Sequence, residues 1–248
     1  MSMLKLDNVM YKDILKGISF SIEEGSFNVL IGRNSSGKST LVKVLAELIG
    51  FRGRITFDGD RPDIGFFTED NLFSYKKVID NISFILINLG YSRKYAENKS
   101  IEMLKYFELE YLKDEEISNL TYSEKRLVEF ISCIIHEPKI MVIDDSFDYL
   151  KDNERKRLIK KIHDMKCAVL FITNKIEDIF YADQVIIIND GKTVLVDTIN
   201  KIVLNEKNFI NNKIYSPFIL DLSYKFLSYK LIDNIMLDYN KMVDSIWK

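Results

Sequence analysis

The chain has 248 residues, a length that allows one large domain or one domain plus a small appendage, and with 47% hydrophobic and 29% charged residues its composition is that of an ordinary globular protein. Its formal net charge of −2 excludes a general nucleic-acid-coating protein, so we expect no nucleic-acid partner. No apolar run approaches the roughly 20 residues that span a bilayer, and no signal peptide is evident. We therefore expect a protein that stays in the cytosol. Two cysteines are too few for a disulfide scaffold, and we expect no structural zinc.

Strands dominate the first third of the sequence. The alternation of apolar and polar residues over 4–11 and 18–22 predicts strands with one buried face. The mostly apolar segment 27–31 predicts a strand that is buried on both faces. A helix is predicted over 41–49, with its end at Gly50, and short strands follow at 53–57 and 64–67.

Helices and then buried strands make up the rest of the chain. Helical spacing of apolar residues is found over 78–89, 101–107 and 127–135. Buried strands are predicted at 140–143, 167–172 and 185–188, with helical segments at 153–163 and 175–181 between them. This alternation predicts an α/β fold with a mostly parallel sheet covered by helices. The tail from about residue 206 is predicted to be helical again.

Residues 32–39 fit the phosphate-loop pattern G-x-x-x-x-G-K-[ST]. Glycines let such a loop curl so that backbone N–H groups face phosphates, and the following helix offers its positive end to the anion. Lys38 is expected to reach the β- and γ-phosphates, and the Ser39 hydroxyl to ligate Mg²⁺. A simple Gly/Ser-rich turn is disfavoured because the loop joins a buried strand to a helix. The expected ATP-binding residues are Gly32, Arg33, Asn34, Ser35, Ser36, Gly37, Lys38, Ser39 and Thr40.

A second acidic element supports nucleotide binding. The apolar strand 140–143 runs into Asp144 and Asp145. In phosphate-loop nucleotide hydrolases a strand of this kind places an aspartate beside Mg²⁺, so we expect Asp144 to be a metal ligand. The alternative is an acid that only ends a strand.

A third motif precedes this acidic strand and consists of Leu120, Thr121, Tyr122, Ser123 and Glu124. It resembles the Leu-Ser-Gly-Gly-Gln signature of ATP-binding cassette (ABC) ATPases, which opens a helix at this place. The positive end of that helix would face a nucleotide held by the opposite subunit. Thr121 and Glu124 also fit a capping box, which would be a purely structural role.

The resemblance implies a fold and further site residues. It implies a P-loop core with an antiparallel N-terminal β subdomain and a helical subdomain at about 75–137, all within an ABC ATPase domain over 1–205. Tyr11 falls where the family stacks an aromatic on adenine, although a core tyrosine is the alternative. Glu69 replaces a glutamine that contacts Mg²⁺ or water. Asp145 replaces the catalytic glutamate, and Asn174 replaces the histidine at the γ-phosphate.

These departures separate binding from hydrolysis. The Asp145 carboxylate is one methylene shorter than that of glutamate, and a misplacement of about 1 Å can cost ~10²-fold in rate. Asn174 carries no positive charge, and Tyr122 is bulky where the family has glycine. Binding of MgATP needs the phosphate loop and Asp144, which are intact. Hydrolysis at this chain's own site depends on the altered positions.

The C-terminal tail indicates which group of ABC ATPases the chain resembles. Pro217, Phe218 and spaced leucines, with the ending 237–248, resemble the C-terminal extension of energy-coupling factor (ECF) transporter ATPases, which helps two ATPases dimerise. We therefore interpret 206–248 as a dimerisation extension, with a generic capping tail as the alternative.

The resemblance implies a MgATP-binding subunit of an ECF-type importer of vitamins or metal ions. Its partners would be a second ABC ATPase, either another copy or, as the altered residues favour, a different chain, and a transmembrane coupling subunit. The complex would place this chain at the cytoplasmic side of the membrane. The alternatives are a subunit of another ABC importer or exporter, and a regulatory cassette that binds ATP without hydrolysis.

Overall fold

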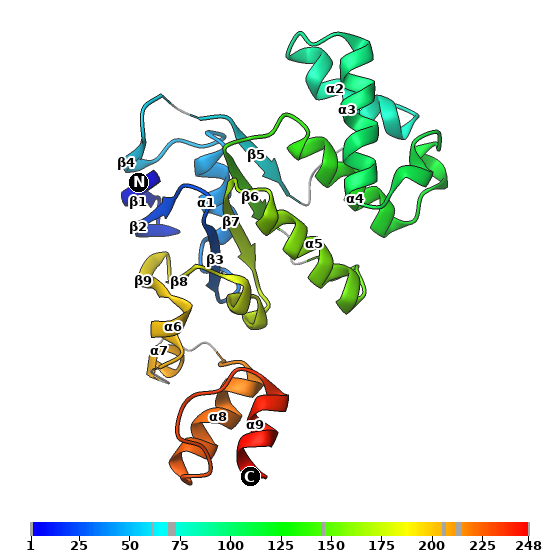
Figure 1. The fold of residues 1–248 in the computed structure, drawn as a ribbon. Coiled ribbons are helices and arrows are strands. Elements are labelled where there is room, and N and C mark those ends of the chain that lie inside the picture. Colours follow the sequence, from blue (N-terminus) through cyan, green and yellow to red (C-terminus); the bar gives the residue numbers. More distant parts are fainter. Residues whose placement is uncertain are drawn as a thin grey trace. The chain divides into compact units, whose positions relative to one another are not determined.

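The chain forms two compact units in a computed structural model that describes residues 2–60, 62–68, 73–144, 147–204, 207–211 and 215–247 (Figure 1). Unit 1 comprises Met1–Leu4, Ile22–Ser26 and Thr56–Ile172. Unit 2 comprises Lys5–Ser21, Phe27–Ile55 and Thr173–Lys248. Among the described residues, no helix has the length and apolar character needed to cross a bilayer.

Parallel strands form the centre of unit 1. The strand order is β5 (Ile64–Phe67), β6 (Ile140–Asp144) and β7 (Ala168–Thr173). Almost every side chain of β6 and β7 is buried, as expected for strands that are covered on both faces. Phe67 pairs with Ile143, and Asp144 pairs with Ile172, so these strands end at a common edge. The predicted parallel arrangement of these segments is confirmed.

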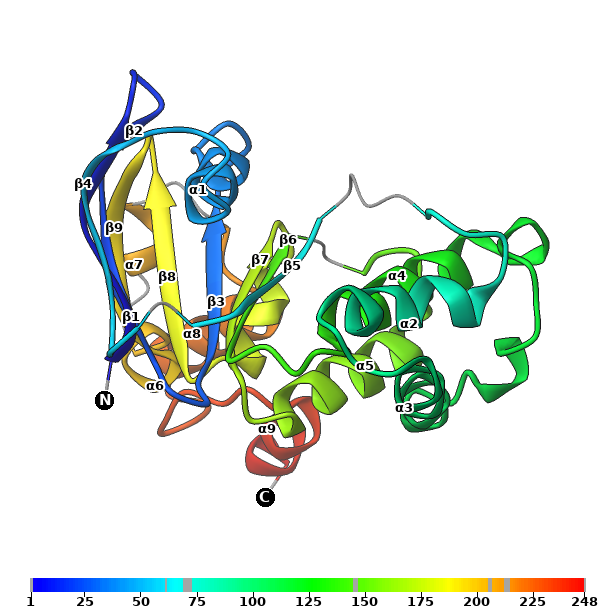
Figure 2. The same ribbon diagram turned by 90° about the horizontal axis from the view of Figure 1, so that it is seen from above.

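The helices predicted at 101–107 and 127–135 begin earlier than the sequence periodicity indicated, at Arg93 and Tyr122, whereas the helix predicted from 78 begins there. The main helices are α2 (Val78–Asn88), α3 (Arg93–Tyr106), α4 (Tyr122–Ile134) and α5 (Asp152–Asp164), and α2, α3 and α4 are seen together in Figure 2. Short 3₁₀ turns at Glu110–Leu112 and Ile117–Asn119 lie between α3 and α4. The predicted start of α3 at 101 is wrong because its first turns are mainly polar. The Ser92 hydroxyl nevertheless caps them by accepting a hydrogen bond from the Tyr95 N–H.

Unit 2 contains a second set of paired strands. Strand β3 (Phe27–Gly32) pairs in parallel with β8 (Gln184–Asn189), which pairs in antiparallel fashion with β9 (Lys192–Thr198). The sequence analysis missed β9 because its burial is mostly intermediate and its apolar pattern is weak. Residues 176–181, which were expected to be helical, form a 3₁₀ helix.

A separate three-stranded sheet has the order β2–β1–β4, from β1 (Ser2–Tyr11), β2 (Leu15–Glu23) and β4 (Arg52–Phe57). A tight turn joins β1 to β2, so these neighbours run antiparallel, as predicted for the N-terminal β subdomain.

Helix α1 (Lys38–Leu45) is displaced from its predicted range of 41–49. It begins inside the phosphate loop. It ends early because Glu47 adopts a left-handed φ of 58°, and the Leu48 N–H then closes the helix on the Lys43 carbonyl at 2.9 Å. The predicted end at Gly50 is therefore wrong.

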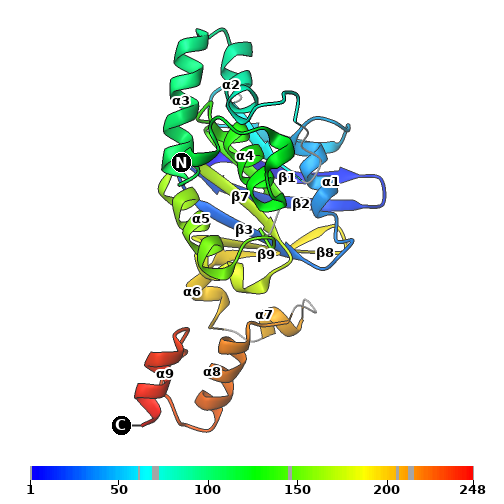
Figure 3. The ribbon, with the colours of Figure 1, turned by 90° about the vertical axis from the view of Figure 1, so that its right-hand side faces the viewer.

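The tail is helical in its described parts, as predicted. Helix α6 (Ile199–Ile202) precedes it, and the tail itself contains α7 (Lys207–Ile210), α8 (Phe218–Ser228) and α9 (Tyr239–Ile246). Helices α8 and α9 lie side by side in Figure 3. The Met236 N–H donates to the Ser223 hydroxyl at 2.8 Å, which fixes the chain between these two helices.

Candidate nucleotide-binding site

The phosphate loop connects β3 to α1 in unit 2, and its two glycines are required by close packing. A Cβ atom on Gly32 would lie 2.4 Å from the carbonyl oxygen of Ile188. Gly37 has a φ of 104°, and a Cβ atom there would lie 2.7 Å from Leu15 Cδ2. Only glycine fits these two places, so the pattern read from the sequence has a steric cause.

Backbone hydrogen bonds hold the curled loop. The Ser36 N–H donates to the Arg33 carbonyl at 3.1 Å, and the Gly191 N–H donates to the Ser36 carbonyl at 3.2 Å. The Gly191 carbonyl accepts from the Lys16 N–H at 2.7 Å. The turn after β8 and the start of β2 therefore support the loop from outside.

Lys38 points back into the loop. Its side chain is largely enclosed, and its Nζ donates to the carbonyls of Gly32 at 2.8 Å and Arg33 at 3.1 Å. The Ser36 hydroxyl is buried and has no hydrogen-bond partner among the described residues. An ammonium, an unsatisfied hydroxyl and the start of a helix are together donors suited to a phosphate chain. The loop therefore fits the β- and γ-phosphates of ATP, and Ser39, exposed at the start of α1, suits Mg²⁺.

Tyr11 and Asn174 belong to the same unit as the loop. Tyr11 is half-buried at the end of β1, and the Lys12 Nζ lies 5.1 Å from its ring centroid. The turn that follows it reaches the loop, since Ile14 O lies 3.5 Å from where a Gly37 Cβ would be. Asn174 is exposed directly after β7, next to Thr173, whose hydroxyl donates to the buried Asp178 carboxylate at 2.6 Å.

Asp144 belongs to unit 1, where it is half-buried at the end of β6. The end of β5, with Thr68 directly beyond it, lies at the same edge because Phe67 pairs with Ile143. Glu69 and Asp145, which the sequence analysis singled out, lie outside the described residues.

The signature segment of unit 1 forms the capping box that the sequence allowed. Thr121 Oγ1 accepts from the Glu124 N–H at 3.3 Å, and Glu124 Oε2 accepts from the Thr121 N–H at 2.8 Å. Leu120 is buried, whereas the Tyr122 side chain is 66% exposed at the first turn of α4. The motif therefore builds a stable helix start whatever else it does.

The signature also contacts the segment that follows β6. The Ser123 hydroxyl donates to the Tyr149 carbonyl at 2.9 Å, and the rings of Tyr122 and Tyr149 meet edge-on with centroids 5.5 Å apart. Sequence analysis missed Tyr149, because nothing in its sequence neighbourhood signals a contact with a helix start.

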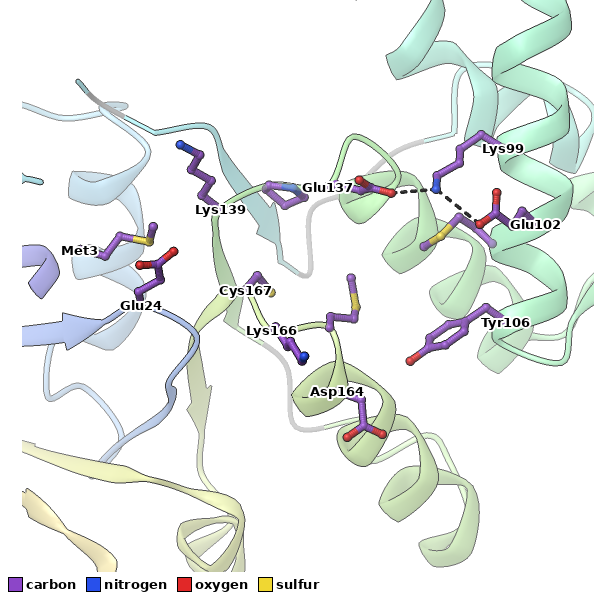
Figure 4. Close-up of a pocket in the computed structure, with 13 residues that line it drawn as sticks. Met3, Glu24, Lys99, Glu102, Tyr106, Glu137, Lys139, Asp164, Lys166 and Cys167 are labelled. Atoms are coloured by element: carbon purple, nitrogen blue, oxygen red, sulfur yellow. Dashed lines mark hydrogen bonds and ion pairs between the residues drawn. The ribbon is translucent and has the colours of Figure 1, made fainter. Parts of the chain in front are cut away.

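Two of the cavities that the described residues form lie in unit 1. One, of about 390 Å³, lies beside the signature and is lined by residues that include Thr121, Ser123 and Glu124. The other, of about 550 Å³, contains none of the predicted site residues (Figure 4). There Lys99 pairs with Glu137 at 2.7 Å and lies 3.5 Å from Glu102, so these charges satisfy one another and we assign no ligand to it.

Hydrogen bonds set the electrostatics of the helix start. The Thr121 hydroxyl and N–H lower the pKa of Glu124 because they favour its charged form. Burial, followed by the hydrogen bond that the Tyr111 hydroxyl donates to Glu124 at 2.9 Å, raises the pKa of Tyr111 to about 12. Glu124 is therefore a carboxylate and Tyr111 a neutral donor at neutral pH.

Known proteins are similar to this chain in sequence and in fold. Residues 15–148 match the family model described as ABC transporter. The chain is 30% identical to the energy-coupling factor transporter ATP-binding protein EcfA1 of Ligilactobacillus salivarius, over 88% of this chain and 85% of that protein. The cbiO1 structure from Clostridium perfringens, part of the ABC transporter complex cbiONQ, matches with a TM-score of 0.74 at 23% identity, over 89% of this chain and 98% of that one.

A third match is a dimeric post-hydrolysis state of the ATP-binding cassette MJ0796 bound to ADP and Pi. Its TM-score is 0.69 at 23% identity, over 79% of this chain and 98% of that one. The fold and the phosphate loop thus define a P-loop ATPase of the cassette type. The chain belongs to the ABC transporter family, as an ATPase homologous to the ATP-binding proteins of energy-coupling factor transporters.

The lowered pKa of Glu124 predicts an acid-sensitive contribution to stability. Glu124→Gln preserves the capping geometry but does not titrate. Because the folded-state pKa lies below the unfolded value, the extra stability of the wild type is present above the unfolded pKa of about 4.5 and is lost as the pH falls through the folded pKa. Urea unfolding from about pH 6 to about pH 3 should show the difference between wild type and variant shrinking. Glu177→Gln, at an exposed site, is the matched control. Parallel stability curves for wild type and Glu124→Gln would contradict the assignment.

Proposed function

We propose that this chain is the ATP-binding subunit of an ECF-type uptake transporter, in which a pair of ATPases uses MgATP to drive a transmembrane coupling subunit. The observation that carries the proposal is the enclosed phosphate loop with Lys38 turned into it. The family and the name of the Ligilactobacillus salivarius relative support the transporter assignment.

Binding would use residues that are unaltered. Lys38 would exchange its two loop carbonyls for phosphate oxygens, which form stronger charge-assisted bonds. The Ser36 hydroxyl would gain a partner in the same step. Ser39 and Asp144 would hold Mg²⁺, and Tyr11 would stack on adenine. When bound, Mg²⁺ neutralises charge on the β- and γ-phosphates.

Hydrolysis would use residues that differ from the family pattern. Asp145 would place a carboxylate short of an attacking water, Asn174 would donate a neutral hydrogen bond to the γ-phosphate, and Glu69 would bring a charge where the family has an amide. Such a site binds ATP well and hydrolyses it slowly. We therefore propose that the second ATPase of the pair is a different chain that performs most of the turnover.

The tail 206–248 would contribute to that pairing. Large apolar side chains of the tail are exposed to solvent: Tyr215, Phe218, Tyr229, Tyr239 and Trp247. A surface of this kind favours burial against another chain.

A regulatory cassette that binds ATP without turnover is the second candidate function. The residues Asp145 and Asn174, at the positions expected to be catalytic, favour it.

Removal of the phosphate-loop lysine should abolish tight nucleotide binding. Lys38→Ala should raise the Kd for MgATP about 10- to 100-fold, since a hydrogen bond to a charged group contributes roughly 1.5–3 kcal/mol. Isothermal titration calorimetry measures this directly. Lys43→Ala, at an exposed position of the same helix, is the matched control and should bind as the wild type does. Equal affinities for both variants would refute the assignment of the loop.

Restoration of the family residues should raise turnover. Asp145→Glu combined with Asn174→His should increase ATP hydrolysis by the assembled complex about 10-fold, because the carboxylate reaches further and an imidazolium can stabilise developing charge. The two single variants are the controls and should each give less. An unchanged rate would remove support for a weakened site.

Purification from native membranes in mild detergent tests the partners. A different ABC ATPase and a small membrane protein should co-purify with this chain in fixed ratio, as identified by mass spectrometry. Two copies of this chain with a membrane protein would correct the heterodimer proposal. Recovery of the chain alone would favour the regulatory cassette.

A further inference from the structure

Arg126 is a buried charge in α4 that the nucleotide-binding scheme does not use. The residue is only 4% exposed. Its Nη1 pairs with Glu129 Oε2 at 2.5 Å, one turn further along the helix. Its Nη2 donates to the carbonyl of Thr68 at 3.0 Å. The guanidinium thus has specific partners on two elements of unit 1.

Aromatic rings surround the same guanidinium. Its central carbon lies 4.4 Å from the ring centroid of Phe67 and 6.0 Å from that of Tyr149. Contacts over ring faces at these distances attract a cation. Phe67 ends β5, and Tyr149 follows β6, so one side chain of α4 touches both segments that leave the edge carrying Asp144.

The opening of α4 contacts the second of these segments independently. Ser123, one turn before Arg126, donates from its hydroxyl to the Tyr149 carbonyl at 2.9 Å. Arg126 therefore connects the helix that carries the signature with the backbone just beyond β5. Beyond β6, Ser123 binds the Tyr149 backbone and Arg126 faces the ring of the same residue.

A buried ion pair is a costly way to fill this space. Apolar residues of similar volume are often equally stable or more stable, so stability alone does not explain the pair. The planar guanidinium offers something that an apolar side chain or an ammonium lacks, namely donors in fixed directions for Glu129 and for the Thr68 carbonyl at the same time.

We propose that Arg126 is a positioning residue that holds the backbone at Thr68 and Tyr149 in register with the signature segment, so that ATP turnover depends on it although it does not touch the nucleotide. The claim that ATP turnover depends on Arg126 rests on the proposed function. The claim that Arg126 orders the segments at Thr68 and Tyr149 does not rest on it, and a separate experiment measures that ordering.

The test compares three variants of the full chain. Arg126→Lys keeps a positive charge opposite Glu129 but removes the planar guanidinium, whose donors point in fixed directions. Arg126→Met with Glu129→Leu removes both charges together, so that no unpaired charge is left inside. Arg155→Lys is the matched control, because Arg155 is likewise a buried arginine, 7% exposed, and lies on α5 instead of the signature helix.

Hydrogen–deuterium exchange gives the first measurement. Both Arg126 variants should exchange about 10-fold faster than the wild type in peptides that cover 62–68 and 147–151, and Arg155→Lys should not. Unchanged exchange in both Arg126 variants overturns the proposal, even if one of them is less stable. If Arg126→Lys fails to fold, exchange in the double variant Arg126→Met with Glu129→Leu alone decides the positioning role.

Turnover by the assembled complex, well below the thermal midpoint, gives the second measurement. The Arg126 variants should lower kcat about 10-fold and leave KM within about twofold, because positioning is lost while binding is kept. A wild-type kcat in both variants overturns the role in turnover. A wild-type complex that hydrolyses no ATP refutes the proposed function instead, and exchange still decides the positioning role.

Discussion

A stack of three phenylalanine rings organises the edge of unit 1 where its strands end. Phe147 lies between Phe67 and Phe171, with each pair of centroids 5.8 Å apart and the rings nearly parallel. Phe130 of α4 meets Phe67 and Phe147 edge-on at 5.3 and 5.8 Å. All four rings are fully buried. Because they come from β5, the segment after β6, β7 and the signature helix, the positions of Asp144 and of the signature both depend on this packing.

In unit 2, the shape of the phosphate loop depends instead on backbone segments that pack so closely that only glycine fits between them. Gly32 lies against the Ile188 carbonyl, and a Cβ atom on Gly191 would lie 2.0 Å from the Ile14 carbonyl. This contact brings together the turn after β1, the phosphate loop and the turn after β8. The loop is therefore shaped by main chain that side-chain substitutions elsewhere hardly affect.

The sequence predicted features that have a local cause. An unbroken run of apolar residues predicted strands such as β6, and glycines at fixed spacing predicted the phosphate loop. It predicted helix boundaries poorly where a cap or a left-handed residue decides them, as at Ser92 and Glu47. The contacts of Arg126 with Thr68 and Tyr149 could not be predicted, because they depend on three segments meeting in space. An arginine on the apolar face of a helix, with a glutamate three residues later, was the available signal.

The signature segment of this chain combines an intact helix start with a bulky outer surface. Thr121 and Glu124 satisfy one another as a capping box, so α4 begins at a capped residue. Tyr122 occupies the first helical position, where a bulky side chain is sterically tolerated, and its ring points into solvent beside Tyr149. The Tyr122 ring therefore obstructs whatever approaches this helix end. On the proposed function that is the nucleotide of the second ATPase, so the substitutions in this one chain would weaken both nucleotide sites of the pair.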